Sequence, residues 1–320
     1  MIQQALSAIN TAISENPAAY ARQVDEAYSR QLLTIARQIY NTREEKPIIL
    51  LAGPSGSGKT TTAMMLERIL DDWGAETHTL SMDHYFRTFT PEEIQQAAEG
   101  KIDLESPDRL DLPFLNQQLL QIFQGQPTQL PKYRFRDSKR IDSGVTLTRK
   151  PGELVILEGI HALNPAVVTE ANSHIVRIYV SVRTRITDGT SVLQPYFLRL
   201  LRRMIRDRLF RHRSLSATLE MLEHVEAGEQ HYIMPYKKYA DLEVDSFHAY
   251  ELGIYKQLLE ADILQLDASP EQKTLCAFLQ QATAFPVEQV PKESLVREFI
   301  GDGISVSYTH LRAHETTLHL

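Results

Sequence analysis

Apolar residues recur along this chain with two different periods, and each period predicts one kind of element. Over residues 1–42 they return every three or four positions, the spacing of amphipathic helices, and Asn16-Pro17 predicts a break between two of them. After residue 47, short continuous apolar runs predict buried strands. Such runs occupy residues 48–52 and 154–157, and residues 78–82 and 175–182 are predicted as two further strands.

Helical patterns lie between and after these strands. They cover residues 60–70, 112–123, 196–212, 215–228 and 248–260, and a punctuated stretch at 131–150 predicts a short hairpin. Strands that alternate with helices predict an α/β fold, in which a parallel sheet is covered by helices on both faces. We therefore expect an N-terminal helical arm over residues 1–46, an α/β domain over 47–265 and a C-terminal extension over 266–305.

The last fifteen residues differ in sequence pattern from the rest of the chain. Residues 306–320 read VSYTHLRAHETTLHL and follow neither a helical nor a strand pattern. Residues 306–316 resemble the translation of a transposase-type sequencing adapter. We therefore interpret 306–320 as a non-native tail, with the natural chain diverging near Ser305. A genuine disordered tail is the alternative.

Composition narrows the class of protein. The formal net charge of −7 argues against a general nucleic-acid binder, and no apolar run approaches the ~20 residues of a membrane span. Residues 1–20 have no basic start and no apolar core, so they do not read as a secretory signal. The single cysteine, Cys276, cannot form an internal disulfide, which fits a reducing compartment. We expect a soluble cytoplasmic protein without membrane or nucleic-acid partners, and we leave a homo-oligomer open.

A glycine-rich turn after the first predicted strand carries the most specific motif. Residues 53–60 read GPSGSGKT and fit the pattern Gly-x4-Gly-Lys-Ser/Thr, with an apolar strand before and a helix after. Glycines let consecutive backbone N–H groups point at phosphate oxygens. Lys59 can reach the terminal phosphates, and the Thr60 hydroxyl can bind Mg²⁺. The predicted nucleoside triphosphate site consists of Gly53, Pro54, Ser55, Gly56, Ser57, Gly58, Lys59, Thr60 and Thr61.

Two acidic residues stand where predicted strands end. Asp83 and Glu158 each follow an apolar strand. Parallel sheets bind ligands beyond the carboxyl ends of their strands, and phosphoryl transfer needs one carboxylate near the metal and another group that accepts a proton. We therefore predict that both acids face the glycine-rich turn of residues 53–60, called the phosphate loop below, rather than cap helices. His84 and His161 lie nearby in the sequence, but without Cys or His partners at ligand spacing we interpret them as structural.

A helix with a high density of arginine follows. Its cationic face consists of Arg199, Arg202, Arg203, Arg206, Arg208, Arg211 and Arg213, and the opposite apolar stripe of Leu198, Leu201, Ile205 and Leu209. In an acidic protein, such a face suits a lid, over residues 196–214, whose guanidinium groups neutralise a transferring phosphoryl group. A solvated helix face or an RNA-binding stripe is the alternative.

In their order along the chain, these segments resemble the uridine kinase and phosphoribulokinase branch of P-loop kinases, most of all bacterial uridine kinase-like nucleoside kinases. The resemblance covers residues 47–262. It rests on GPSGSGKTT, LSMDHYF, LESPDRLD, LPKYRF with the following Arg140, VILEGIHALNP, RLLRRMIRDRLFRHRS and MPYKKYAD. It implies a P-loop NTPase fold and an ATP-dependent small-molecule kinase, with ATP or GTP and Mg²⁺ as cofactors.

The resemblance also implies roles for the matching residues. Asp83 matches the catalytic base that takes the proton of a sugar 5′-hydroxyl, and Thr60, Asp83 and Glu158 match the Mg²⁺ environment. Glu105 matches an acid that binds the ribose 2′- and 3′-hydroxyls. The other matches are Tyr133 and Phe135, which frame the nucleobase; Lys59, Arg203 and Arg206, which act on the transferring group; and Arg140, Arg203, Arg211 and Arg213, which bind substrate.

Three positions depart from the pattern of this family. Characterised uridine/cytidine kinases carry Asp at the position of Glu105, His at that of Ser138 and a Gln near Met221. The last two read the base, so these departures bear on base recognition and not on the transfer chemistry. The prediction is phosphoryl transfer from ATP to the 5′-hydroxyl of a nucleoside, with uridine or cytidine the best guess. Open alternatives are a kinase of another small-molecule hydroxyl, such as a sugar phosphate or pantothenate, and a nucleotide-binding regulatory NTPase.

Overall fold

The computed structural model describes residues 2–169, 172–265 and 270–303, so the tail at 306–320 and the boundary near Ser305 lie outside the described residues. Its centre is a five-stranded parallel sheet with the strand order β10-β7-β2-β6-β3. The strands are β2 (Ile48–Ala52), β3 (Thr77–Ser81), β6 (Leu154–Glu158), β7 (Ile175–Ser181) and β10 (Leu242–Asp245). Four of them confirm the predicted strands to within one residue at either end. The fifth, β10, was not predicted, because its alternating LEVD is only four residues long.

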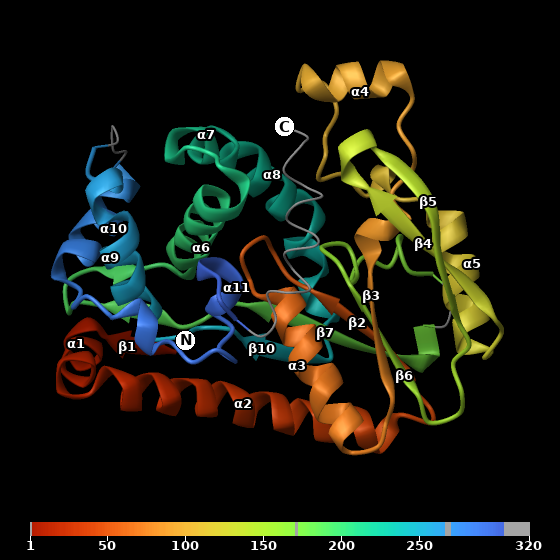
Figure 1. The fold of residues 1–320 in the computed structure, drawn as a ribbon, viewed down its shortest axis with the longest axis horizontal. Coiled ribbons are helices and arrows are strands. Elements are labelled where there is room, and N and C mark those ends of the chain that lie inside the picture. Colours follow the sequence, from red (N-terminus) through yellow and green to blue (C-terminus); the bar gives the residue numbers. More distant parts are fainter. Residues whose placement is uncertain (1, 170–171, 266–269, 304–320) are drawn as a thin grey trace.

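Helices and two smaller sheets surround the central sheet (Figure 1). In the first half of the chain the helices are α1 (Leu6–Glu15), α2 (Pro17–Thr42), α3 (Lys59–Asp72), α4 (Pro91–Ala98) and α5 (Leu112–Phe123). In the second half they are α6 (Pro195–Arg211), α7 (Leu215–Glu220), α8 (Leu222–Tyr232), α9 (Glu251–Ile263), α10 (Pro270–Gln281) and α11 (Arg297–Ile300). The smaller sheets are the hairpin of β4 (Thr128–Arg134) with β5 (Lys139–Leu147) and the trio of β1 (Gln3–Ala5), β8 (Arg185–Thr187) and β9 (Val192–Leu193).

Both faces of the central sheet are covered, as the sequence predicts. Successive residues of a strand point to opposite faces. Ile49 and Leu51 of β2 therefore enter the core shared with α2, α3 and α9, whereas Ile48 and Leu50 enter the core on the side of α5. The carboxyl end of β2, which leads into the glycine-rich loop, therefore lies between two packed layers.

The predicted helices omit α4 and, in the C-terminal extension, α10, and the structure also differs from the prediction near residue 221. α4 was missed because none of its residues is buried, so it shows no apolar stripe. Its start is instead marked by a capping box, in which Thr90 and Glu93 exchange hydrogen bonds of 2.8 and 3.2 Å. The helix predicted at 215–228 is two helices, α7 and α8, which meet at Met221.

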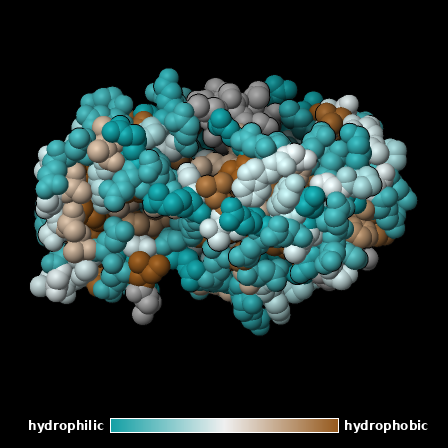
Figure 2. Space-filling model, turned by 90° about the horizontal axis from the view of Figure 1, so that it is seen from below, coloured by the Kyte–Doolittle hydropathy of each residue, from teal (hydrophilic) through white to brown (hydrophobic). Residues whose placement is uncertain are grey.

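The N-terminal helices and the C-terminal segment share one core with the sheet. Leu32 and Ile39 of α2 are fully buried there, and so are Phe278 of α10 and Phe299 of α11. Seen from the side on which α2 lies, the surface is mainly hydrophilic, with hydrophobic residues in small separate areas (Figure 2). In the described part of the chain, no helix combines the length and the apolar character that crossing a membrane requires.

Candidate active site

The phosphate loop leaves the carboxyl end of β2 and leads directly into α3. Gly58, the residue before α3, has a φ of 84°, a left-handed conformation that favours glycine. Gly56 has a φ of +74°, and a Cβ at this position would lie 2.8 Å from the backbone oxygen of Arg199 in α6. The loop therefore requires glycine both for its curl and because α6 approaches it closely.

Lys59 occupies the first position of α3, and its ammonium group donates a hydrogen bond to the Pro54 carbonyl oxygen at 3.2 Å. Burial lowers the pKa of this lysine, while the negative charges of Glu158, Glu298 and Asp83 oppose that shift. The two acids predicted at strand ends therefore lie within electrostatic reach of the lysine. Glu298 is a third acid at this place, and it comes from the far end of the chain.

The strand register explains why the two predicted acids meet. β3 and β6 are neighbours in which Ser81 pairs with Glu158, and Asp83 lies two residues beyond Ser81. On its other side, Glu158 pairs with Leu51 of β2, the strand that leads into the phosphate loop. Together with Thr60, these two carboxylates offer only oxygen atoms, the ligand type that Mg²⁺ prefers, so the residues present fit that ion.

A cluster of arginines around Asp207, a residue of α6, adds positive charge beside the loop. Arg203 donates a hydrogen bond to the Ser55 hydroxyl of the phosphate loop at 3.4 Å. Asp207 is 0 % exposed, and four guanidinium groups surround its carboxylate. These are Arg203 and Arg206, both at 3.8 Å, Arg211 at 3.1 Å and Arg213 at 3.4 Å. One carboxylate cannot neutralise four cations, so the cluster keeps a net positive charge that suits an anionic ligand.

The pKa values of the arginines reflect this excess of positive charge. Burial, and then the like charge of Arg206, lower the pKa of Arg211 to about 9. Burial and the charge of Arg206 also lower the pKa of Arg203. Arg211 stays charged at neutral pH, and an anion placed between the two guanidinium groups would stabilise their charged forms.

The prediction that all seven arginines share one cationic face is wrong at Arg202. This side chain is 0 % exposed, and its guanidinium group pairs with Glu251 of α9 through bonds of 2.7 and 2.9 Å. A third hydrogen bond, of 3.1 Å, reaches the Gly56 carbonyl oxygen in the phosphate loop. Arg199 is likewise paired with Glu229 of α8, at 2.7 Å. Helical spacing cannot reveal these counter-charges because they come from other helices.

We expect Arg202→Met to lower the free energy of unfolding by about 3–5 kcal/mol, because it leaves the buried Glu251 carboxylate without its partner. Urea unfolding followed by circular dichroism measures the change. The matched control is Arg208→Met on the same helix. The ion pair of Arg208 with Asp262 is half exposed, and its loss should cost at most about 1 kcal/mol. Equal stability of the two variants would contradict a structural role for Arg202.

Glu105, which lies against α8, is another acid of the candidate site. Burial raises the pKa of Glu105, while the charges of Arg203 and Lys59 favour its ionised form. A Cβ at Gly228 of α8 would lie 2.7 Å from the Glu105 Cβ, so this glycine makes room for the acid. Nearby, His161 is 2 % exposed, and burial lowers its pKa to about 4. The imidazole is therefore neutral at physiological pH.

The aromatic residues predicted to frame a base belong to the β4–β5 hairpin. Tyr133 is 1 % exposed, and its hydroxyl accepts a hydrogen bond of 3.3 Å from Arg109. Its ring meets that of Phe135 edge to face, with centroids 5.1 Å apart. Phe135 is only partly buried, so of the two it offers more ring surface to a ligand. Arg140 is paired with Asp111 at 2.8 Å.

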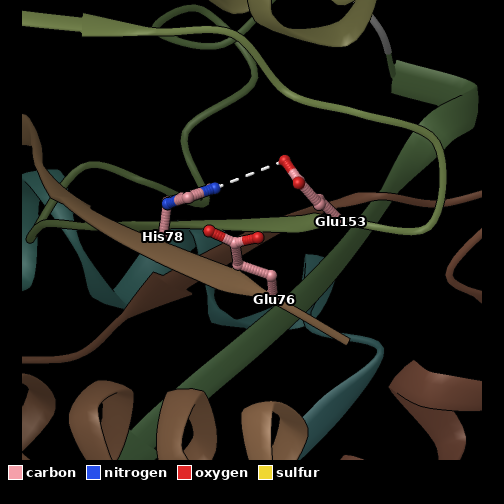
Figure 3. Close-up of side chains that lie close together, drawn as sticks. All are labelled: Glu76, His78 and Glu153. Carbon is pink, nitrogen blue, oxygen red and sulfur yellow. Dashed lines mark hydrogen bonds and ion pairs between the residues drawn. The ribbon is translucent and has the colours of Figure 1, made fainter. Parts of the chain in front are cut away.

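A separate cluster of acids with a histidine lies at the amino ends of β3 and β6, away from the phosphate loop. Figure 3 shows Glu76, His78 and Glu153 pointing toward one another, with ligand atoms within 4.8 Å. Burial alone would raise the pKa of Glu153, but hydrogen bonds from Lys150 and His78 lower it to about 2. The Lys150 ammonium lies 3.1 Å from Glu153 and 3.9 Å from Glu76. Because this lysine already supplies positive charge, we assign a salt-bridge cluster and not a metal centre.

Comparison with known proteins places this site in a family. The model of the Phosphoribulokinase / Uridine kinase family matches residues 48–252. The chain belongs to this family.

Similar proteins include two uridine kinases. The uridine kinase of Lactobacillus helveticus (strain DPC 4571) is 33% identical over 200 residues, which cover 62% of this chain and 86% of the relative. The uridine kinase of Staphylococcus aureus (strain JH9) is 32% identical over 196 residues, which cover 61% and 85%. Among solved structures, a protein of Silicibacter sp. TM1040 described as a fructose transport system kinase aligns with a TM-score of 0.47 at 17% identity, over 66% of this chain and 98% of that one.

Membership of the Phosphoribulokinase / Uridine kinase family makes the chain an ATP-dependent kinase of a small-molecule alcohol, with the P-loop fold that the sequence predicts. Kinases of this family generally use ATP and Mg²⁺. The family match ends within α9, so Glu298 lies outside it, and no motif marks that residue in the sequence. Asp207 was also missed, although it is the one acid within the arginine run RRMIRDRLFRHR.

Proposed function

We propose that the chain transfers the γ-phosphoryl group of ATP to the 5′-hydroxyl of a nucleoside, with uridine or cytidine as the best acceptor. The observation that carries the proposal is the position of Glu105. This acid interacts electrostatically with Lys59 of the phosphate loop, with Arg203 of α6 and with Asp83. A carboxylate at that place can accept hydrogen bonds from ribose hydroxyls beside the transfer centre. The names of the relatives, uridine kinases from two bacteria, support the same acceptor class.

The positions of the other residues support distinct roles in the transfer. Asp83 accepts the proton of the acceptor hydroxyl while that oxygen bonds to the γ-phosphorus and the bond from the γ-phosphorus to the β-phosphate oxygen breaks, releasing ADP. Lys59 balances charge on the transferring group. When bound by Thr60, Asp83 and Glu158, Mg²⁺ would neutralise phosphate charge.

The arginines differ in how closely they approach this centre. Arg203 contacts Ser55 of the phosphate loop, and the positive charge of Arg206 helps to lower the pKa of Lys59. We therefore assign these two arginines to the transferring phosphoryl group. Arg211 lies further along α6 and Arg213 in the turn after it, where they keep the cluster positive and bind substrate.

The distribution of cations favours a nucleoside over a sugar phosphate. A second phosphate on the acceptor would require available guanidinium or ammonium groups on the acceptor side. Arg140 is paired there with Asp111, and Arg109 stacks on Phe89 with its guanidinium carbon 3.8 Å from the ring centroid. The partly buried ring of Phe135 instead offers a surface on which a base can stack.

A panel of acceptors tests this proposal. Uridine, cytidine, adenosine, ribose, a pentose phosphate and pantothenate are each supplied with ATP and Mg²⁺, and ADP release is measured in a coupled assay. We expect the highest kcat/KM with uridine and cytidine, and little ADP without an acceptor. A preference for the pentose phosphate or pantothenate would replace the nucleoside assignment. ADP release at the same rate with and without an acceptor would indicate a regulatory NTPase instead.

A further inference from the structure

The C-terminal segment reaches the phosphate loop from outside the family match. Glu298, in α11, is 237 residues from its partner Thr61 in the first turn of α3. The Glu298 Oε2 atom accepts two hydrogen bonds from this one residue. The Thr61 backbone N–H donates at 3.2 Å, and the Thr61 hydroxyl donates at 2.6 Å.

This contact lies at the N-terminal turn of α3, where an anion is favoured. The first N–H groups of a helix have no partner within the helix, and together with the helix dipole they attract negative charge. Gly58 precedes α3 and has no side chain with which to cap it. The helical pairing begins one residue after Thr61, where the Thr62 N–H donates to the Gly58 carbonyl oxygen at 3.0 Å. The Thr61 N–H is thus one of the groups that a triphosphate in this loop would use, and a carboxylate holds it.

The backbone that carries Glu298 is firmly anchored, whereas its side chain is not fully enclosed. Leu295 and Phe299 are fully buried, and Leu295 packs where a Cβ on Gly58 would otherwise lie. Arg297 fixes the segment further by donating hydrogen bonds to the carbonyl oxygens of Val287 and Val290 at 3.1 and 2.6 Å. Glu298 itself is only partly buried. Rotation of this one side chain can free Thr61 without moving the segment.

We propose that Glu298 sets the nucleotide affinity of this site by competing with the phosphates for Thr61. Without nucleotide the carboxylate caps α3, and when a triphosphate binds, charge repulsion turns the carboxylate away. The proposal rests on the proposed function only in taking the triphosphate to bind at this loop.

The size of the effect follows from a two-state equilibrium. Only molecules with Glu298 turned away bind nucleotide, so the apparent Kd is the intrinsic Kd divided by their fraction. Hydrogen bonds to a charged group favour the capped state roughly ten- to hundredfold. Removing the carboxylate should therefore tighten nucleotide binding by that factor. Because Glu298 has already left the loop in the bound state, turnover at saturating ATP should stay within about twofold of the parent.

Calorimetric titration with a non-hydrolysable ATP analogue and Mg²⁺ tests the proposal without any acceptor. The variants are Glu298→Ala and Glu298→Gln, and the matched control is Glu288→Gln, an exposed residue of the same C-terminal segment. We expect tighter binding in Glu298→Ala, a smaller gain in Glu298→Gln, whose neutral amide still can accept a hydrogen bond, and no change in the control. Thermal melting adds a second readout, because a lost cap lowers the Tm without nucleotide while the rise in Tm on nucleotide addition becomes larger.

Binding that is unchanged or weaker in both Glu298 variants would overturn the competition and leave Glu298 as a structural cap. Failure of the parent and all variants to bind the analogue would overturn the nucleotide site itself, and with it the proposed function. The two failures are therefore distinguishable.

Discussion

Asp83→Asn is expected to reduce turnover by about 10²–10⁴-fold, because the amide keeps the shape of the side chain but cannot accept the proton of the acceptor hydroxyl. Nucleotide binding should weaken much less, since Lys59 and the loop N–H groups still hold the phosphates. The loss of one negative charge beside the metal should also raise the Mg²⁺ requirement modestly. Turnover measured across a Mg²⁺ titration with the best acceptor separates the two effects.

Glu158→Gln is the matched comparison, because it makes the same change of charge on the neighbouring strand. We expect this variant to show the larger metal effect and the smaller loss at saturating Mg²⁺. If excess Mg²⁺ restores Asp83→Asn to near parent activity, Asp83 is only a metal-site residue. The proton acceptor would then have to be another group, and Glu105 is one candidate because its charge interacts with Asp83.

Lys59→Ala should lower turnover by about 10²–10³-fold, the typical effect of removing one electrostatic stabiliser of the transition state. Burial lowers the pKa of Lys59, which means that the charged form is costly in the folded protein. The variant should therefore be at least as stable as the parent toward urea. Steady-state kinetics and unfolding curves on the same preparation check both statements.

The control for this variant is Lys273→Ala, which changes an exposed lysine of α10. It should leave both turnover and stability as in the parent. Turnover of Lys59→Ala within threefold of the parent would show that the phosphates are held elsewhere. A large loss of stability in Lys59→Ala, without a loss in the control, would show that its hydrogen bond to Pro54 supports the loop.

Local sequence patterns were enough to predict the parts of the fold that depend on neighbouring residues. Two of the four predicted central strands are continuous apolar runs, and the phosphate loop combines a spaced motif with a strand and a helix. The convergence of Asp83 and Glu158 could also be anticipated, because parallel strands end at the same side of a sheet. β10 and α4 could not be anticipated, since one is too short and the other buries no side chain.

Long-range partners account for what sequence reasoning missed at the site. The density of arginine in α6 predicts a cationic face. Only the fold shows that Glu251 neutralises Arg202 and that Asp207 forms ion pairs with four other arginines. The contact between Glu298 and Thr61 is of the same kind. A pattern within one helix has no information about the charge that another helix brings to it.

The pairing of β1 with β8 has a consequence for the order in which the chain can fold. Gln3 pairs with Arg185, and the cap on Thr61 comes from Glu298. During synthesis, the first strand therefore waits for residue 185, and the cap on the first turn of α3 waits for residue 298. Contacts between such distant residues are slow to form because a long loop must first close. The nascent chain thus carries an unpaired first strand until β8 is made, although α2 can pack on α3 much earlier.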